Sequence, residues 1–305
     1  MLNSAYVHQF VRWLRSLKTV LICHADRNII RHGTAPWMDS FSDLVGIIEI
    51  EDKPGSRWAS VKREARRVGW LGLLNVILFR VYYKLFLAKR DAVWAGERLQ
   101  QLKQTYQPLR EDIPVLRTHS PNTKAAREFL ESLEPDIIYA ACKHILKPRI
   151  FEIARMGTLV IHPGICPQYR NAHGCFWALA NNDLENVGGT LLQIDAGIDT
   201  GPVYKYLRAD FDEVNESHIV IQQRMMYDNL DVLAQTFRDI HEGRLLDLDT
   251  KGQPSHEWGQ PWLTAYLQWK WQARRRAKRA RSVASSRPVN ANESPANEPE
   301  VSRIR

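Results

Sequence analysis

Short runs of β-branched and other apolar residues recur along the first two thirds of the chain and predict β-strands. They cover 18–23, 45–50, 113–116, 135–140, 158–161 and 189–194. Between several of them the apolar spacing becomes helical, as in 122–134, where Phe129, Leu130 and Leu133 recur on one side. Strands that alternate with helices predict an α/β fold with a Rossmann-like, mostly parallel sheet and flanking helices. In such sheets ligands bind beyond the carboxyl ends of the strands.

Residues 54–110 interrupt this alternation and predict a helical insertion. The stretch 70–87 is almost entirely apolar, and Arg80 and Lys84 form one narrow polar stripe along it. Three interpretations remain open: a helix packed on the domain, peripheral membrane contact through 60–90, or a membrane span. A helix packed on the domain is the ordinary interpretation of such a stretch. The basic residues of 60–67 support membrane contact, whereas the short length and two charges disfavour a span.

The C-terminal third predicts a long helix, a basic helix and a tail. Residues 215–243 carry a broad apolar stripe typical of one core-facing helix. The run 274–281 contributes six of the +8 net charge, so the rest of the chain is not a basic nucleic-acid platform. We expect that run to be solvated and the Ser-, Pro- and Asn-rich remainder to be disordered.

These patterns together predict five regions. They are an N-terminal part of the α/β domain (1–53), the helical insertion (54–110), a catalytic core (111–245), a C-terminal extension with a basic helix (246–281) and a disordered tail (282–305).

The cysteines and the N-terminus indicate a cytoplasmic protein. Cys23, Cys142, Cys166 and Cys175 form no C-x-x-C pair, which is typical of free thiols in a reducing compartment. No His or Cys set has the spacing of metal ligands, so no metal is expected. The first residues lack an uninterrupted apolar segment and therefore do not read as a signal peptide.

Candidate chemistry is concentrated in residues 157–204. A predicted strand ends at His162, and a second one leads into a loop that holds Asp195 and Asp199 among glycines. Alone, a histidine before proline or a glycine-rich acidic loop is more often structural than functional. Together they suggest that the histidine and an aspartate meet at adjacent strand ends. A carboxylate beside an imidazole favours the protonated ring, which can stabilise negative charge and exchange protons.

This block resembles the folate-dependent formyltransferase family, which includes the phosphoribosylglycinamide, methionyl-tRNA and amino-sugar N-formyltransferases. The family signature is roughly N-x-H-x-S-L-L-P-x-Y-R-G, followed by a strand and a D-x-G-x-D-x-G loop. The chain has VIHPGICPQYRN at 160–171 and DAGIDTG at 195–201. The resemblance covers about 110–205 well and 1–50 weakly, and it implies the formyltransferase fold.

The resemblance implies transfer of a formyl group from 10-formyltetrahydrofolate to an amine. In the family an Asn and a His stabilise the oxyanion, and an Asp holds the His; here His162 and Asp199 match the last two. Val160 stands where the family has Asn and cannot donate a hydrogen bond. We expect Asn171 to substitute as the donor, with His173 as the next candidate. The folate is expected against two loops, namely Cys142, Lys143, His144, Ile145 and Leu146, and Asp195, Ala196 and Gly197.

The acceptor is expected to be a small molecule that carries an amine: a nucleotide sugar, an amino acid or a purine precursor. The tRNA-specific relatives have a C-terminal β-barrel for which the residues after 245 offer little room, so tRNA is not expected as a partner. Two alternatives remain open: a catalytically impaired relative that binds folate or a partner, and a membrane-surface accessory protein. The oligomeric state is left open.

Overall fold

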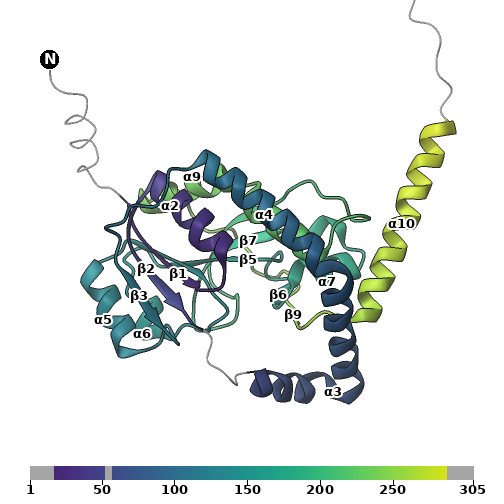
Figure 1. Ribbon diagram of the computed structural model, residues 1–305, viewed down its shortest axis with the longest axis horizontal. Helices are drawn as coiled ribbons and strands as arrows, with labels where there is room; N and C mark the ends of the chain where they lie inside the picture. Colours follow the sequence, from purple (N-terminus) through teal and green to yellow (C-terminus); the bar gives the residue numbers. More distant parts are fainter. Residues whose placement is uncertain (1–16, 52–56, 287–305) are drawn as a thin grey trace, which may run out of the picture.

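A seven-stranded sheet forms the centre of the computed structural model, which describes residues 17–51 and 57–286 (Figure 1). Its strands lie in the order β3-β2-β1-β4-β5-β7-β8. Their bounds are β1 Lys18–His24, β2 Asp43–Ile50, β3 Val115–Thr118, β4 Ile137–Ala141, β5 Thr158–His162, β7 Gly189–Gln193 and β8 Val203–Leu207. The strands from β3 to β5 are parallel, whereas β7 and β8 each run antiparallel to the preceding neighbour. The predicted α/β class and mostly parallel sheet are confirmed.

Helices cover both faces of the sheet because successive strand residues point to opposite sides. In β1, Val20 and Ile22 pack in one buried cluster with α5 and α6, and Leu21 packs in the other cluster with α2, α7 and α9. The bounds are α2 Ala35–Phe41, α5 Lys124–Leu133, α6 Pro148–Phe151, α7 Gly174–Ala180, α8 His218–Tyr227, α9 Leu230–His241 and α10 Leu263–Ser286. The shorter elements are η1 Ile30–Thr34, η3 Leu184–Asn186, β6 Arg170–Asn171 and β9 Glu257–Trp258.

The expectation of one helix over 215–243 is wrong, because two helices occupy this span. Helix α8 ends at Tyr227 and α9 begins at Leu230. Between them, Asn229 donates its side-chain amide to the carbonyls of Arg208 (2.8 Å) and Met225 (3.0 Å). Asparagine competes in this way with the helical hydrogen bonds of the backbone. The apolar stripe is nevertheless core in both helices.

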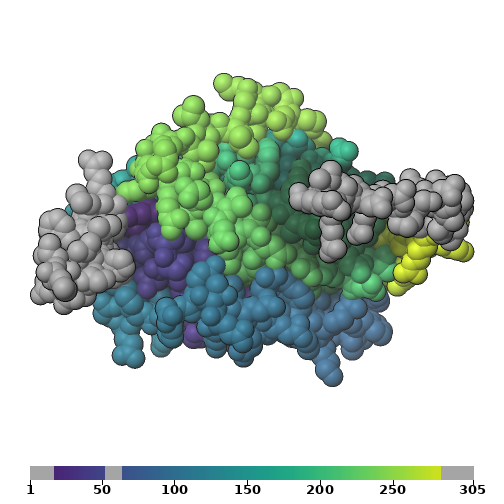
Figure 2. All heavy atoms as spheres, turned by 90° about the horizontal axis from the view of Figure 1, so that it is seen from above, coloured from purple at the N-terminus to yellow at the C-terminus, as the bar shows by residue number. Residues whose placement is uncertain are grey.

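Residues 57–105 form a nearly continuous helical arm along one edge of the molecule. It consists of α3 Arg57–Tyr82, η2 Tyr83–Leu87 and α4 Ala88–Thr105, and α3 is kinked at Gly69, whose φ is 70°. A left-handed φ interrupts a helix and is tolerated by glycine. In Figure 2 the blue atoms of this arm form a ridge along the lower edge of the view.

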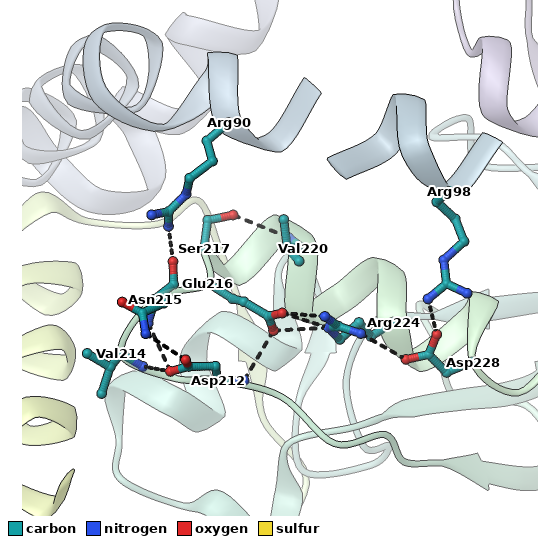
Figure 3. Close-up of polar contacts among 10 residues, drawn as sticks. All are labelled: Arg90, Arg98, Asp212, Val214, Asn215, Glu216, Ser217, Val220, Arg224 and Asp228. Carbon is teal, nitrogen blue, oxygen red and sulfur yellow. Dashed lines mark hydrogen bonds and ion pairs between the residues drawn. The ribbon is translucent and has the colours of Figure 1, made fainter. Parts of the chain in front are cut away.

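Polar contacts tie α4 to the segment that leads into α8 (Figure 3). Arg90 donates to the backbone carbonyl of Asn215, and Arg98 pairs with the Asp228 carboxylate. Ser217 caps α8 by accepting from the Val220 N–H (3.2 Å), and it donates to the buried Asp91 of α4 (2.6 Å). The helical arm is therefore anchored to the domain by charged and buried polar groups.

The basic run 274–281 is not a free tail, because it lies on α10 and that helix docks on the body. Trp269 is fully buried, and the Lys270 ammonium lies 4.1 Å from its ring centroid while donating to the Glu213 carbonyl (2.8 Å). Burial lowers the pKa of Lys270 to about 8. Arg276, inside the run, pairs with the Glu213 carboxylate. The helix continues to Ser286, into the segment expected to be disordered; the rest of that segment, 287–305, lies outside the described residues.

Replacing Trp269 by Ala should lower the free energy of unfolding by about 3–5 kcal/mol, because it removes a fully buried indole. Trp271→Ala, on the exposed side of the same helix, is the matched control and should change stability little. Truncation after Arg281 should leave stability unchanged, since the docked residues precede that point. Urea unfolding of the three variants measures this, and equal losses in both Trp variants would show that α10 is not docked.

Candidate active site

His162 closes strand β5 on a face of the sheet that two loops cover. Because strand residues alternate, Val160 and His162 share this face, together with their pairing partners Leu192 and Thr190 on β7. The Thr190 hydroxyl donates to the Gly164 carbonyl (2.6 Å) and accepts from the Cys166 N–H (3.0 Å). These two bonds hold the loop after β5 down against the sheet.

Asp199 does meet His162, although not at adjacent strand ends as the sequence suggested. Strand β7 runs antiparallel to β5, so its last residue, Gln193, pairs with Leu159 rather than lying beside His162. The loop after β7 folds back instead. It brings Asp199 Oδ2 to 3.2 Å from His162 Nδ1, and the same oxygen accepts the Asn171 backbone N–H (2.8 Å).

The second ring nitrogen of His162 also faces an acceptor. Nε2 lies 2.7 Å from the backbone carbonyl oxygen of Tyr169, and the residue is only 4% exposed. A neutral imidazole has one N–H and would satisfy one of these two acceptors, whereas an imidazolium satisfies both. Both ring nitrogens of His162 therefore face acceptors, and the loop that carries Tyr169 covers the nitrogen opposite Asp199.

This cover depends on close approach between backbone segments. A Cβ on Gly164 would lie 2.5 Å from the Tyr169 carbonyl oxygen and 2.9 Å from His162 Nε2. A Cβ on Gly174 would lie 2.4 Å from the same oxygen. Any side chain at these positions would push the loop away from His162. The sequence pattern contained both glycines, but it could not show that they touch.

The expected substitute donor, Asn171, has another partner. Its side-chain amide donates to the Trp258 carbonyl (2.8 Å), and its backbone N–H holds Asp199. A role as oxyanion donor would require the bond to Trp258 to break, so the geometry does not favour it and the role stays a prediction. Val160 packs against Cys166, Leu192 and Val203, and its side chain offers no donor.

Three residues that support the site were missed in the sequence reading. Arg170 donates to the carbonyl of Ile198 (2.7 Å) and so joins the two loops. The Tyr169 ring stacks on Trp258 at 5.5 Å, and Trp258 also stacks on Trp177 at 5.0 Å. Tyr169 and Arg170 both lie in the motif at 160–171, so the sequence offered a signal for them. No sequence feature near the motif indicates Trp258, which reaches the site from β9.

A pair of histidines, the half-buried His173 and the buried His218, lies behind the covering loop. The rings of His173 and His218 are 5.7 Å apart, and Nδ1 of each has no hydrogen-bond partner among the described residues. Burial lowers the pKa of His173 to about 4, and the nearby Lys143 ammonium adds to this. Burial also lowers the pKa of His218 well below its ordinary value. Both rings are therefore neutral near pH 7.

The two segments expected to hold folate flank one apolar cluster. Leu146 belongs to it, and Cys142 and Ile194 pack against it. Lys143 donates its N–H to His24 Nε2 (3.2 Å), the His144 ring lies 5.4 Å from that of His24, and Ile145 is exposed. Asp195 accepts from the Gly197 N–H (2.9 Å), so its carboxylate shapes its own loop.

A cavity of about 500 Å³ adjoins the second of these segments. Asp195, Ala196 and Ile194 line it together with Phe151 of α6 and Met156. Its volume lies in the range of small-molecule sites. The residues Cys142–Leu146 do not line this cavity, so the structure brings only one of the two expected segments to it.

The described residues contain no group of three His, Cys, Asp or Glu side chains placed to hold a metal ion. The cysteines are free, and burial raises the pKa of Cys142 to about 11 and that of Cys175 to about 12. Protonated, buried thiols are poor nucleophiles. The chemistry of this site therefore centres on the His162–Asp199 pair.

The family model for formyl transferase matches residues 86–236, which include His162, Asp199 and both loops. Residues 86–236 belong to the formyltransferase family. The matched span begins inside the expected helical insertion and ends before 245, and the five predicted regions stay a prediction.

Similar proteins include formyltransferases with different acceptors. The chain is 33% identical over 138 residues to the methionyl-tRNA formyltransferase of Pelobacter propionicus, covering 45% of this chain and 43% of the relative. It thus spans less than half the length of the curated relatives it matches. A sugar N-formyltransferase from Shewanella is 13% identical, with a TM-score of 0.46, covering 79% of this chain and 77% of that one. A 4-N formyltransferase from Francisella tularensis is 10% identical, with a TM-score of 0.48, covering 85% and 88%.

The lowered pKa of His173 predicts a loss of stability in acid. Between its ordinary value of 6.5 and about 4, the unfolded chain binds a proton that the folded protein excludes. The free energy of unfolding should therefore fall as the pH drops through this window, by on the order of 3 kcal/mol. Urea unfolding at several pH values should show a flatter stability profile for His173→Asn, because the titrating imidazole is gone. Asn is chosen because it tolerates the left-handed backbone at this position. His119→Asn, on the surface, is the control; an unchanged slope in His173→Asn would refute the assignment.

Proposed function

We propose that this protein is an N-formyltransferase that moves a formyl group from 10-formyltetrahydrofolate to an amine on a small molecule. The acceptor classes are a nucleotide sugar, an amino acid or a purine precursor. The observation that carries the proposal is the contact of 3.2 Å between His162 and Asp199 inside the span that matches the family. We further propose that the reaction takes place in the cytoplasm.

The reaction assigns a task to each of these residues. The nitrogen of a neutral amine attacks the formyl carbon, a C–N bond forms and the carbonyl oxygen becomes an oxyanion. An N–H of His162 faces that oxygen and stabilises its charge. The attacking nitrogen loses a proton, the folate nitrogen gains one, and the bond between the formyl carbon and the folate nitrogen breaks. Asp199 keeps Nδ1 protonated and the ring oriented throughout.

Turnover requires the loop from Pro163 to Asn171 to move. Nε2 of His162 is bonded to the Tyr169 carbonyl and is buried, so substrate reaches it only when this bond opens. The loop itself is held by the Arg170 bond to Ile198 and by the Asn171 bond to Trp258. We infer that substrate binding competes with these contacts, as expected of a site gated by a loop.

The folate is proposed to enter along the cavity beside Asp195 and Ala196. A ring placed there would contact the side chains of Phe151 and Met156 and polar groups of the loop after β7. For the acceptor, the exclusion of tRNA finds no support among the relatives, because curated matches are methionyl-tRNA formyltransferases. An assay of formyl transfer to candidate acceptors should therefore include an aminoacylated tRNA as well as the small amines.

A second candidate function is folate binding with little or no catalysis. Two observations favour it: Val160 replaces the donor that the family places two residues before the histidine, and His162 Nε2 has a protein partner. The loss of a single oxyanion donor costs about 10²–10³ in rate. Binding of a 10-formyl folate analogue without transfer to any acceptor would support this candidate.

Replacement of His162 or Asp199 by Ala should reduce formyl transfer at least about 10²-fold, because each removes part of the group that stabilises the oxyanion. Release of the deformylated folate from a chromogenic analogue measures the rate. The matched control is His241→Ala, which removes a histidine that faces a carboxylate, Asp136, from α9. Circular dichroism confirms folding. Near-normal turnover in either site variant would remove the His162–Asp199 pair from the mechanism.

Val160→Asn should raise kcat by about 10²-fold, since it restores the missing donor on the face that His162 occupies. The same change should lower the free energy of unfolding by about 1–3 kcal/mol, because the amide enters an apolar contact with Leu192 and Val203. Val160→Ala disturbs the same apolar contact without adding a donor and serves as the control. A rate that Val160→Asn leaves unchanged would show that another group already fills the oxyanion position.

A further inference from the structure

The outer side of α3 and η2 is an exposed apolar stripe on an otherwise packed helix. Trp70 is 82% exposed and Leu71 is 87% exposed. The stripe continues at helical spacing through Leu74, Ile77, Leu78, Val81, Leu85 and Phe86, all exposed. Soluble proteins rarely leave so many contiguous large apolar side chains in water, and such patches mark interaction sites.

The neighbouring helix α10 extends this surface. Asn75 of α3 and Thr264 of α10 exchange two hydrogen bonds, of 2.9 Å and 3.1 Å, so the helices lie side by side at this end of the molecule (Figure 1). On the exposed side of α10, Leu267 and Trp271 precede the basic residues, and the Arg275 guanidinium lies 4.5 Å above the Trp271 ring. In Figure 2 the yellow atoms of α10 lie at the right-hand end of the blue ridge.

Basic residues dominate the charge of these two helices, and the single acidic residue of α3, Glu64, pairs with Arg67. Residues 65–90 contain six basic residues and no Asp or Glu, and residues 263–286 contain seven basic residues and no Asp or Glu. Of these, Lys84, Lys89, Arg274, Arg275, Lys278, Arg279 and Arg281 have exposed side chains. Apolar side chains flanked by Lys, Arg and Trp are the pattern of an element that lies in the interface of an anionic membrane.

We propose that this surface, formed by the exposed side of residues 70–86 and of 267–281, binds the protein peripherally to an anionic lipid bilayer. The apolar stripe enters the boundary between headgroups and acyl chains, and the basic residues contact lipid phosphates. This proposal is independent of the acceptor and of the catalytic activity.

The charge pattern disfavours a second copy of the chain as the occupant. A symmetric dimer places the same surface against itself, so residues 65–90 of one copy would face basic residues of the other. The one acidic residue on α3, η2 or α10 is Glu64, which already pairs with Arg67, so these helices offer no further carboxylate to neutralise Arg80, Lys84 or the basic run in such a contact. Like charges brought together in a desolvated interface oppose association, whereas lipid phosphates complement them.

The inner side of the same helix disfavours a membrane span. A continuous helical stretch, Glu64–Thr105, contains an 18-residue window apolar enough to cross a bilayer, and 28% of that window is buried in the protein. Phe79 is buried with its ring 5.9 Å from that of Phe176 and 5.4 Å from that of Tyr266. A span would strip these contacts and the α4 anchors of Figure 3, so the helix lies on the membrane with the domain above it.

Flotation of the full-length protein with lipid vesicles tests the proposal. The protein should float with vesicles of phosphatidylcholine mixed with phosphatidylglycerol, bind less to phosphatidylcholine alone, and be partly released by salt. Leu71→Glu combined with Leu78→Glu should weaken the partition at least about tenfold. Both side chains are exposed, so folding should be retained, as circular dichroism would show. The matched control is Val232→Glu combined with Leu246→Glu, exposed apolar residues of α9 and of the loop after it.

A charge variant separates the electrostatic part. Arg275→Glu combined with Lys278→Glu should reduce binding to the anionic vesicles while leaving the weak binding to phosphatidylcholine nearly unchanged. Three results would overturn the proposal. The first is flotation that Leu71→Glu combined with Leu78→Glu does not change. The second is a protein that binds no vesicles but forms a dimer in analytical ultracentrifugation, with the same variant dissociating the dimer. The third is cellular protein that resists extraction from membranes at alkaline pH, as a membrane span would.

Discussion

The catalytic geometry depends on one carboxylate oxygen that serves two donors. Asp199 Oδ2 contacts His162 Nδ1 and accepts the backbone N–H of Asn171. It thereby joins strand β5, the loop after β5 and the loop after β7. Because β7 is antiparallel to β5, this carboxylate cannot be delivered by the sheet alone. The loop after β7 must fold back, and the Arg170 bond to the Ile198 carbonyl holds it in that position. The site is therefore set by contacts between loops, with the sheet as their platform.

The sequence predicted the sheet well where each strand was a continuous apolar run, because strands buried on both faces have that composition. It missed β8, Val203–Leu207, whose Lys205 and tyrosines interrupt the run at the sheet edge. It found His162 and Asp199 because both lie in a local motif. It could not find the Tyr169 carbonyl, since a backbone oxygen has no side-chain signature, or Trp258, which meets the motif from 87 residues away along the chain.

Residues outside the matched family span complete this site. The match ends at 236, yet Trp258 lies against Tyr169 and Trp177 and its carbonyl accepts from Asn171. The β9 segment thus supports the loop that covers His162. The loop is consequently held from both sides: by Asp199 and Ile198 on one, and by Trp258 on the other. Such a doubly held cover explains how a histidine can be preorganised and yet shielded until substrate displaces the Tyr169 carbonyl.

The surface proposed for the membrane lies close to this cover. The ring centroids of Phe79 on α3 and His218 are 5.5 Å apart, and His218 lies against His173, the residue that precedes α7 after the covering loop. Packed side chains can transmit a displacement from one site to another. Binding to a membrane would change turnover only if it favoured one arrangement of the loop that covers His162 over another. The inner side of α3 is buried against α7 and α10, and only its outer side faces lipid. A bilayer that touches the outer side alone has equal contact with both loop arrangements, so it would hold the enzyme at the membrane without altering the rate at the site. Coupling would require the membrane to shift Phe79 itself, because the Phe79 ring lies against His218.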